Sequence, residues 1–173
     1  MTITYKQAIQ SDICDVLLLE QDLFGNKPSY KPEIREGYEK FLELGGIINL
    51  QYVDGKLNAI LASIDTCNLN ASILELPEDS PFRMNYESGR LNGRNGQWIY
   101  EFAGIGSQRS GLYREFRKYT SAFGFVPLSN NEAVTAFLQV FSVDGIVPNI
   151  YNSDEADVVF VHPKMISVSS HNP

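Results

Sequence analysis

The sequence predicts a mixed α/β domain built around a largely antiparallel sheet. Two strand-like runs flank Asp54-Gly55, a dipeptide typical of tight hairpin turns. An apolar run over 98–103 leads directly into a glycine-rich turn and then into a helix-like pattern. Two further apolar runs, at 146–151 and 158–161, predict a final hairpin. Strand and helix periodicities therefore alternate along the chain, which is typical of an α/β fold.

The N-terminal quarter predicts one strand and two helices. Residues 2–8 alternate as a first strand. Ser11-Asp12 is a candidate N-cap for a helix whose apolar residues recur at helical spacing until Gly25. A second helix is expected to begin near Pro32 and to end at Gly45-Gly46.

The hairpin comes next and is followed by an irregular stretch. Residues 47–53 and 56–65 are the two expected strands, and the turn between them requires positive φ at both positions. Residues 73–76 predict a short strand. The segment 77–97 is rich in Pro, Gly, Asn and Arg and predicts a long loop, which in a compact domain is usually functional or disordered.

Residues 98–128 predict a strand, a glycine-rich turn, a helix and a strand end. Trp98–Ala103 is enriched in aromatic and β-branched residues and predicts a buried strand. After the turn, apolar residues at helical spacing predict a helix ending at Gly124, namely Leu112, Phe116, Tyr119 and Phe123. Phe125–Leu128 then predicts the end of a strand.

A last helix precedes the C-terminal hairpin. Ser129-Asn130 is its expected cap and Gly145 its expected end. Its apolar face would hold five residues: Ala133, Ala136, Phe137, Val140 and Phe141. We expect one domain over 1–165 and a polar tail over 166–173.

Composition and charge exclude several functional classes. The 173 residues are 43% hydrophobic and 20% charged, so the chain can bury a core. The net charge of −7 disfavours nucleic-acid binding. No apolar run reaches the roughly 18 residues of a membrane span, and the N-terminus lacks a signal-peptide pattern, so a cytoplasmic protein with no membrane contact is expected.

Cysteine and histidine residues predict neither disulfides nor a metal site. Cys14 and Cys67 are expected to stay reduced, with Cys14 on the buried side of the first helix. The two cysteines and the two histidines, His162 and His171, are scattered without ligand spacing, so no metal is expected.

The strand–turn–helix unit over 98–123 carries the clearest chemical signal. A strand that ends in glycines and feeds a helix presents backbone N–H groups to an anion at the helix N-terminus. Arg109 and Arg114 add positive charge, so the unit suits a phosphate or pyrophosphate. It is neither a Rossmann nor a Walker motif, and a glycine-rich turn alone is more often structural.

Three motifs together resemble the GCN5-related N-acetyltransferase (GNAT) family. Its acyl-CoA loop, Gln/Arg-x-x-Gly-x-Gly/Ala, is similar to residues 108–113 here, matching at Gln108 and Gly111. Residues 46–55 resemble its second strand and turn. Asn130-x-x-Ala133-x-x-x-Phe137, with Gly145-Ile146 downstream, resembles its fourth helix. The resemblance covers most of residues 2–163 and implies a GNAT-like sheet flanked by helices.

The resemblance implies transfer of an acyl group from acetyl-CoA or another acyl-CoA to an amine of a small molecule or peptide. The acceptor would lie near residues 30–38 and the 77–97 loop. Family members are often dimers, so a homodimer is an open possibility. The implied cofactor-binding residues are Phe102, Ala103, Gly104, Ile105, Gln108, Arg109, Ser110, Gly111, Leu112, Tyr113 and Asn130.

Glu101 is the first candidate for a catalytic base. It is the only acid in the apolar run 98–103, and burial there would raise its pKa toward neutrality. Strand alternation places it on one face with Ala103, with Tyr100 and Phe102 on the other. The alternatives, an ion pair with an arginine such as Arg109 or an exposed position, remain open.

Two departures from the family pattern leave two functions open. Tyr113 stands where the family has Gly or Ala, and Phe137 stands where many members have a tyrosine acid. A phenyl ring cannot protonate a leaving thiolate, so Tyr113 or a water would have to do so. The chain is therefore an acyltransferase or a non-catalytic GNAT-like binding module, and an α+β interaction protein outside the family is the third alternative.

Overall fold

The computed structural model describes most of the chain. The described residues are 1–26, 32–69, 71–83, 95–105, 111–112, 118–119, 121–128, 130–139, 141–148 and 156–163. The predicted tail lies outside them. The helices are α1 (Ile13–Phe24), α2 (Arg35–Glu43) and α5 (Asn131–Leu138). The strands are β1 (Ile3–Gln7), β2 (Ile47–Val53), β3 (Lys56–Asp65), β4 (Gln97–Gly104), β5 (Ala122–Pro127), β6 (Phe141–Pro148) and β7 (Ala156–Pro163).

The strands form one sheet in the order β1-β2-β3-β4-β5-β7-β6. Every neighbouring pair is antiparallel except β4 and β5, which are parallel. The predicted mixed fold with a mostly antiparallel sheet is therefore confirmed. The hairpin is also confirmed, since Asp54 and Gly55 have φ of 49° and 81° between strands with the predicted bounds.

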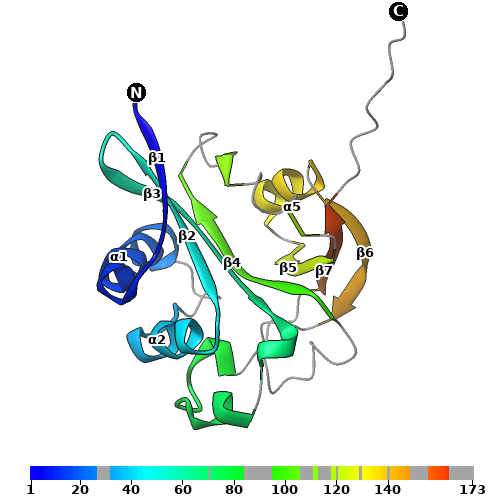
Figure 1. The fold of residues 1–173 in the computed structure, drawn as a ribbon. Coiled ribbons are helices and arrows are strands. Elements are labelled where there is room, and N and C mark those ends of the chain that lie inside the picture. Colours follow the sequence, from blue (N-terminus) through cyan, green and yellow to red (C-terminus); the bar gives the residue numbers. More distant parts are fainter. Residues whose placement is uncertain are drawn as a thin grey trace, which may run out of the picture.

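Helices cover the sheet on both faces. In Figure 1, α1 and α2 lie together beside the β1–β4 half, and α5 lies beside β5 to β7. One core cluster joins α1, α2 and the strand residues that face them, including Val16, Tyr38, Phe41 and Trp98. A second cluster joins the opposite face to α5 through Phe137.

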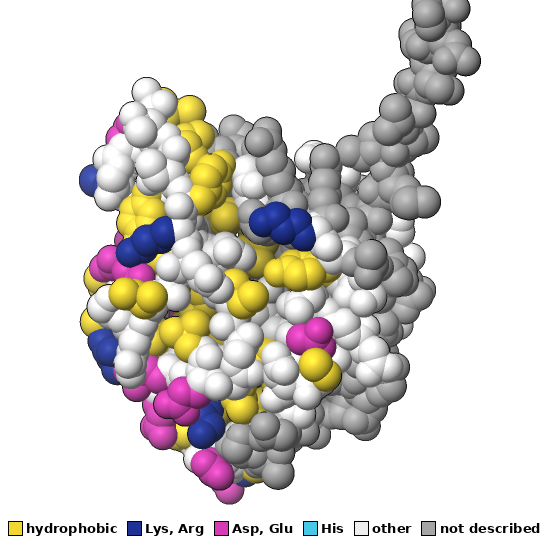
Figure 2. Space-filling view, viewed as in Figure 1, with side chains coloured by type: hydrophobic (Ala, Val, Ile, Leu, Met, Phe, Trp, Pro, Cys, Tyr) yellow, Lys and Arg dark blue, Asp and Glu magenta, His cyan; other side chains and the backbone are white. Residues whose placement is uncertain are grey.

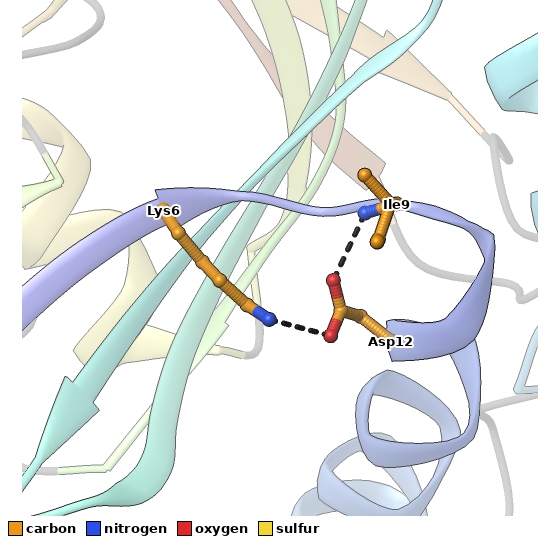
Figure 3. A network of polar contacts seen from close by, with 3 residues as sticks. All are labelled: Lys6, Ile9 and Asp12. Atoms are coloured by element: carbon orange, nitrogen blue, oxygen red, sulfur yellow. Dashed lines mark hydrogen bonds and ion pairs between the residues drawn. The ribbon is translucent and has the colours of Figure 1, made fainter.

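The entry into α1 depends on Asp12, which the sequence predicts as part of a cap. Asp12 Oδ2 accepts a hydrogen bond from the Ile9 N–H at 2.9 Å, and Lys6 Nζ lies 2.6 Å from Asp12 Oδ1 (Figure 3). The Ile9 N–H and the Lys6 ammonium both hold the pKa of Asp12 below its usual range. A short 3₁₀ turn, Gln10–Asp12, precedes the helix, and α1 ends directly before Gly25 as predicted.

Four local predictions are wrong. Residues 73–76 lie in or beside a 3₁₀ helix, Ala71–Glu75, instead of a strand. Phe123 and Gly124 belong to β5, where both pair with β7, and not to the end of a helix. Phe141 and Gly145, expected in and after the last helix, lie in β6, because α5 stops at Leu138. Cys14 is exposed, as is Cys67; both are free thiols.

The final hairpin is confirmed and begins earlier than predicted, since β6 and β7 pair from Phe141 to Pro148. The second helix starts at Arg35, three residues after the predicted Pro32. Within the described part of the chain, no helix is long and apolar enough to cross a membrane.

Candidate active site

The central feature of the candidate site is the divergence of β4 from β5. The two strands pair only at Gln97–Ala122, Trp98–Phe123 and Ile99–Gly124. In Figure 1, β4 then runs away from β5 while it remains paired with β3 as far as Gly104. In the antiparallel β3–β4 ladder, the Ile105 N–H faces β3 and donates to the Asn58 carbonyl at 3.0 Å. Alternation therefore directs the N–H groups of Phe102 and Gly104 toward the diverging side.

A β-bulge at Tyr100 changes which β4 side chains point to each face of the sheet. Ile99 pairs with Ser63 and Glu101 with Ala62, so Tyr100 is an extra residue on β4. Tyr100 and Glu101 both reach the side of α2, through contacts with Glu33 and Tyr38. The prediction that Tyr100 shares a face with Phe102 is therefore wrong, because simple alternation does not hold across a bulge. Phe102 packs on α5 instead, with its ring 5.7 Å from that of Phe137.

Glu101, the predicted base, lies half-buried and hydrogen-bonded. The Tyr38 hydroxyl of α2 contacts Glu101 Oε2 on one side and Glu20 Oε1 of α1, at 2.9 Å, on the other. Tyr38 is fully buried and Glu20 is 1% exposed. Burial, followed by the charges of Glu101 and Glu20, raises the pKa of Tyr38 well above its usual range, so its hydroxyl is neutral.

Glu33, in the segment before α2, accepts hydrogen bonds from three other parts of the site. Its Oε1 accepts from the Ile34 N–H at 2.9 Å and the Ser80 hydroxyl at 3.0 Å. Its Oε2 accepts from the Phe82 N–H at 2.8 Å and from the Tyr100 hydroxyl. Burial raises the pKa of Glu33, while the hydrogen bonds from these donors act against that rise. This single carboxyl group therefore ties α2, the 80–83 segment and β4 together.

Gly37 of α2 gives a first test of this packing. A Cβ at Gly37 would lie 2.2 Å from Glu33 Oε1 and 2.5 Å from Glu33 Cδ. Replacing a helical glycine by alanine normally stabilises a helix by about 1 kcal/mol. We expect Gly37→Ala to destabilise the protein instead, by about 1–3 kcal/mol, because the carboxyl group must move. Urea unfolding measures this, and a stabilised variant would contradict the described packing.

Asn58 fixes the start of the glycine-rich turn. Its Nδ2 donates to the Ile105 carbonyl at 3.2 Å and to Gln51 Oε1 at 3.0 Å, while its own carbonyl accepts from Ile105. Gly104 lies against β3, where an added Cβ would be 2.5 Å from Ala59 Cβ. Ala103 is buried against the α1 and α2 side, and the Ile105 side chain is exposed. The residues entering the turn are thus held from β3.

Gly111, predicted to bind the pyrophosphate, has a packing role that the sequence did not indicate. A Cβ there would lie 1.8 Å from the Tyr5 hydroxyl oxygen and 3.1 Å from Gln51 Nε2. A larger residue at 111 would therefore disturb β1 and β2 as well as the turn. Leu112, next to it, is buried in the core on the α5 face.

Asn130 and Phe137 lie at the two ends of α5. Asn130 Oδ1 accepts from the Ala133 N–H at 3.2 Å, which confirms its predicted capping role. Phe137 is 5% exposed and packs between Phe102 and Phe141. The residue that the resemblance aligns with the tyrosine of many GNAT members is thus a buried ring without a titratable group.

The remaining predicted site residues lie outside the described ones. These are Gln108, Arg109, Ser110 and Tyr113. Of the loop arginines, Arg83 donates to the Leu76 carbonyl, while Arg90 and Arg94 are also outside the described residues. In the described ranges, no group of three or more His, Cys, Asp or Glu side chains could hold a metal ion.

The surface beside α2 is acidic. Figure 2 shows acidic side chains gathered on the lower part of the face drawn in Figure 1. Exposed carboxylates from α2 and the segment after β3 are Glu36, Glu43, Glu75, Glu78 and Asp79. Lys40 lies 3.4 Å from Glu43 and 3.6 Å from Glu75, and it offsets part of that charge.

Sequence reasoning missed Glu20, Glu33 and Tyr100 as members of the site. A glutamate in the apolar pattern of 13–24 was the available signal for Glu20, since it falls four residues after the buried Val16. No signal linked Glu33 to Tyr100, because the two are 67 residues apart.

Comparisons with known proteins bear on the fold. No protein-family model matches the chain, and no curated protein matches its sequence. Solved structures do match, and acetyltransferases are among them. NAA60 of Arabidopsis thaliana in complex with acetyl-CoA has a TM-score of 0.65 at 15% identity, covering 94% of this chain and 100% of that one.

Two bacterial structures are similar to the same extent. The ribosomal-protein-S18-alanine N-acetyltransferase of Escherichia coli has a TM-score of 0.63 at 14% identity, covering 99% of this chain and all of its own. A GNAT-family acetyltransferase of Bacillus cereus ATCC 10987 has a TM-score of 0.63 at 13% identity, covering 96% of this chain and all of its own. Nearly the whole chain therefore has the GNAT fold, with a strongly diverged sequence.

Proposed function

We propose that this GNAT-fold chain is an acyl-CoA-dependent N-acyltransferase that transfers an acetyl or other acyl group to an amine of a small molecule or peptide. The divergence of β4 from β5 after Ile99 carries the proposal, because it opens the sheet beside the strand that holds Glu101. Acetyltransferases of the same fold, including two whose structures contain acetyl-CoA, support acyl-CoA as the donor.

The chain's own groups suit each step of such a transfer. The Glu101 carboxylate takes a proton from the acceptor ammonium, directly or through one water. The freed amine nitrogen forms a bond to the thioester carbon as the carbon–sulfur bond breaks. The N–H groups of Phe102 and Gly104 point toward the diverging side, where they stabilise the carbonyl oxygen. The leaving thiolate takes a proton from Tyr113 or from water.

The donor is held by the glycine-rich turn in this proposal. Backbone N–H groups of residues 109–113 and the Arg109 side chain bind the pyrophosphate, next to Gln108, Ser110 and Leu112. Asn58 supports this by fixing Ile105 at the start of the turn. The acidic surface near α2 favours a positively charged acceptor, since it attracts ammonium groups.

A second function is favoured by Phe137. Its buried phenyl ring, between Phe102 and Phe141, removes the acid that many family members place in that slot. A GNAT-like module that binds a ligand or protein without acyl transfer would not need that acid. Turnover of acetyl-CoA with an amine distinguishes the two functions.

Calorimetric titration with acetyl-CoA tests the donor site. We expect saturable binding with a micromolar dissociation constant, competed by free CoA. Arg109→Ala should weaken binding at least tenfold because it removes a pyrophosphate contact. Arg35→Ala, which removes a half-exposed guanidinium from α2, is the matched control and should bind like the wild type.

Two results would contradict the donor site. One is the absence of binding by acetyl-CoA, CoA and longer acyl-CoAs, and the other is equal binding by both variants. A Gly111 variant is a poor control, since its side chain would collide with Tyr5.

A further inference from the structure

A row of directly opposed residues crosses four strands of the sheet. Tyr5 of β1 lies opposite Gln51 of β2, which in turn lies opposite Ala59 of β3. Ala59 lies opposite Gly104 of β4. Opposed residues share a face of the sheet, and Ala59 belongs to the core cluster beside α5. The row therefore lies on the α5 face, and its side chains become smaller from the edge strand toward β4.

A β-bulge in β3 adds a side-chain amide to the same face. Ala59 pairs with Gln51, and Leu57 pairs with Tyr52. Asn58, between them, is therefore an extra residue on β3. Its side chain bonds that of Gln51, which places it on the α5 face together with Ala59. In a regular strand, a residue next to Ala59 would point to the other face.

Hydrogen bonds connect this row to the residue that follows β4. Asn58 Nδ2 donates to the Ile105 carbonyl at 3.2 Å and to Gln51 Oε1 at 3.0 Å. Gln51 Nε2 donates to the Tyr5 hydroxyl oxygen at 3.3 Å. A backbone carbonyl can only accept, so the Ile105 carbonyl fixes the orientation of the Asn58 amide and, through it, that of Gln51. Both amides are buried, which strengthens these bonds.

The other end of this hydrogen-bonded network meets Gly111. A Cβ at Gly111 would lie 1.8 Å from the Tyr5 hydroxyl oxygen, 2.7 Å from Tyr5 Cζ and 3.1 Å from Gln51 Nε2. Tyr5 and Gln51 thus occupy the space that a side chain at this position would need. The same network therefore contacts both Ile105 and Gly111, the described residues on either side of 106–110.

We propose that Tyr5, Gln51 and Asn58 are positioning residues for the acyl-CoA donor, because they restrain both ends of the donor-binding segment. This inference rests on the proposed function, in which residues 109–113 bind the pyrophosphate. Donor groups bind an anion more tightly when their geometry is fixed before the ligand arrives. The network provides this restraint from β1, β2 and β3, and its three side chains act without touching the ligand.

Removing the Tyr5 hydroxyl tests this role by calorimetric titration. Tyr5→Phe removes the bond from Gln51 and the atom nearest to Gly111. The acetyl-CoA dissociation constant should rise about two- to tenfold, the factor that corresponds to one net hydrogen bond. Gln51→Leu removes the bonds to both Asn58 and Tyr5 and should have the larger effect. Tyr52→Phe, the same change on the α1 and α2 side of β2, is the matched control and should bind like the wild type.

A double-mutant cycle tests the contact between Tyr5 and Gly111. In the wild-type background, Gly111→Ala should weaken acetyl-CoA binding at least about tenfold, because its Cβ would collide with the Tyr5 side chain. Tyr5→Ala removes the two atoms nearest to that Cβ. In this second background, adding Gly111→Ala should cost less than about threefold. Equal costs in both backgrounds would overturn the contact.

Kinetic constants separate a positioning role from a general loss of structure. In an active enzyme, Tyr5→Phe should raise KM for acetyl-CoA while kcat and KM for the amine stay the same, whereas a partly unfolded preparation loses kcat.

The outcomes distinguish this inference from the proposed function. A wild type that binds acetyl-CoA, with Tyr5→Phe and Gln51→Leu binding it equally well, would overturn the positioning role and leave the donor site in place. A wild type that binds no acyl-CoA would contradict the proposed function and the positioning role together.

Discussion

Replacing Glu101 by glutamine should lower kcat for acyl transfer by about 10²–10⁴-fold, the range expected for the loss of a general base. Glutamine retains the size of the side chain and can still contact the Tyr38 hydroxyl, but it cannot accept the ammonium proton. The remaining rate should rise with pH as free amine becomes available. Steady-state kinetics from pH 6 to 10 measure both effects.

The matched control for this variant is Asp22→Asn, which changes an exposed carboxylate on α1 that is not part of the acidic surface beside α2. It should retain wild-type kinetics. The dissociation constant for acetyl-CoA should be unchanged in both variants, because neither residue is placed against the donor. A Glu101→Gln enzyme with the wild-type rate and pH profile would remove Glu101 from the reaction.

Replacing Glu33 by alanine should cost about 3–5 kcal/mol of folding stability. The change leaves four buried or half-buried donors without their acceptor: Ile34 N–H, Ser80 Oγ, Phe82 N–H and Tyr100 Oη. Each unsatisfied buried donor costs about 1–3 kcal/mol, and relaxation toward water recovers part of that cost. Chemical denaturation gives the free energy of unfolding.

Two variants calibrate the Glu33 result. Ser80→Ala removes one donor and should cost about 1 kcal/mol. Glu43→Ala, which removes an exposed carboxylate at the end of α2, should change the free energy of unfolding by less than about 0.5 kcal/mol. A Glu33→Ala effect as small as that of Glu43→Ala would show that the carboxyl group does not hold these segments together.

The strands were predictable where short-range chemistry decides the structure. The bounds of β2 and β3 follow from Asp54-Gly55, since only a tight turn with positive φ fits between the two runs. The Ile73–Leu76 run gave no such constraint, because a short apolar run suits a buried strand or a buried helical turn equally. Phe123 continues the helical spacing of the apolar residues before it, but a phenylalanine is also common in strands. In the structure it lies in a strand because it pairs with β7.

The candidate site was predictable only in part, for a related reason. Glu101 stood out because it is the one acid in an apolar strand. Tyr38 lies within the second predicted helix, yet helical spacing gives the same signal for a ring with or without hydrogen-bond partners. Its partners lie 18 and 63 residues away, and no local pattern records contacts of that range. The bulge likewise depends on pairing with β3.

That bulge has a consequence for how the chain can change in length. Removing Tyr100 would leave Ile99 and Glu101 as consecutive residues opposite Ser63 and Ala62, which is regular pairing. The side chains of the other β4 residues would still point to the same faces of the sheet. The pairing of β3 with β4 therefore does not depend on Tyr100, which is held instead by the packing of its ring on Phe41, Phe82 and Trp98 and by its hydroxyl contact with Glu33. Lineages with this fold that lack both the aromatic cluster and a Glu33 equivalent should tolerate a shorter fourth strand, whereas those that have them should not.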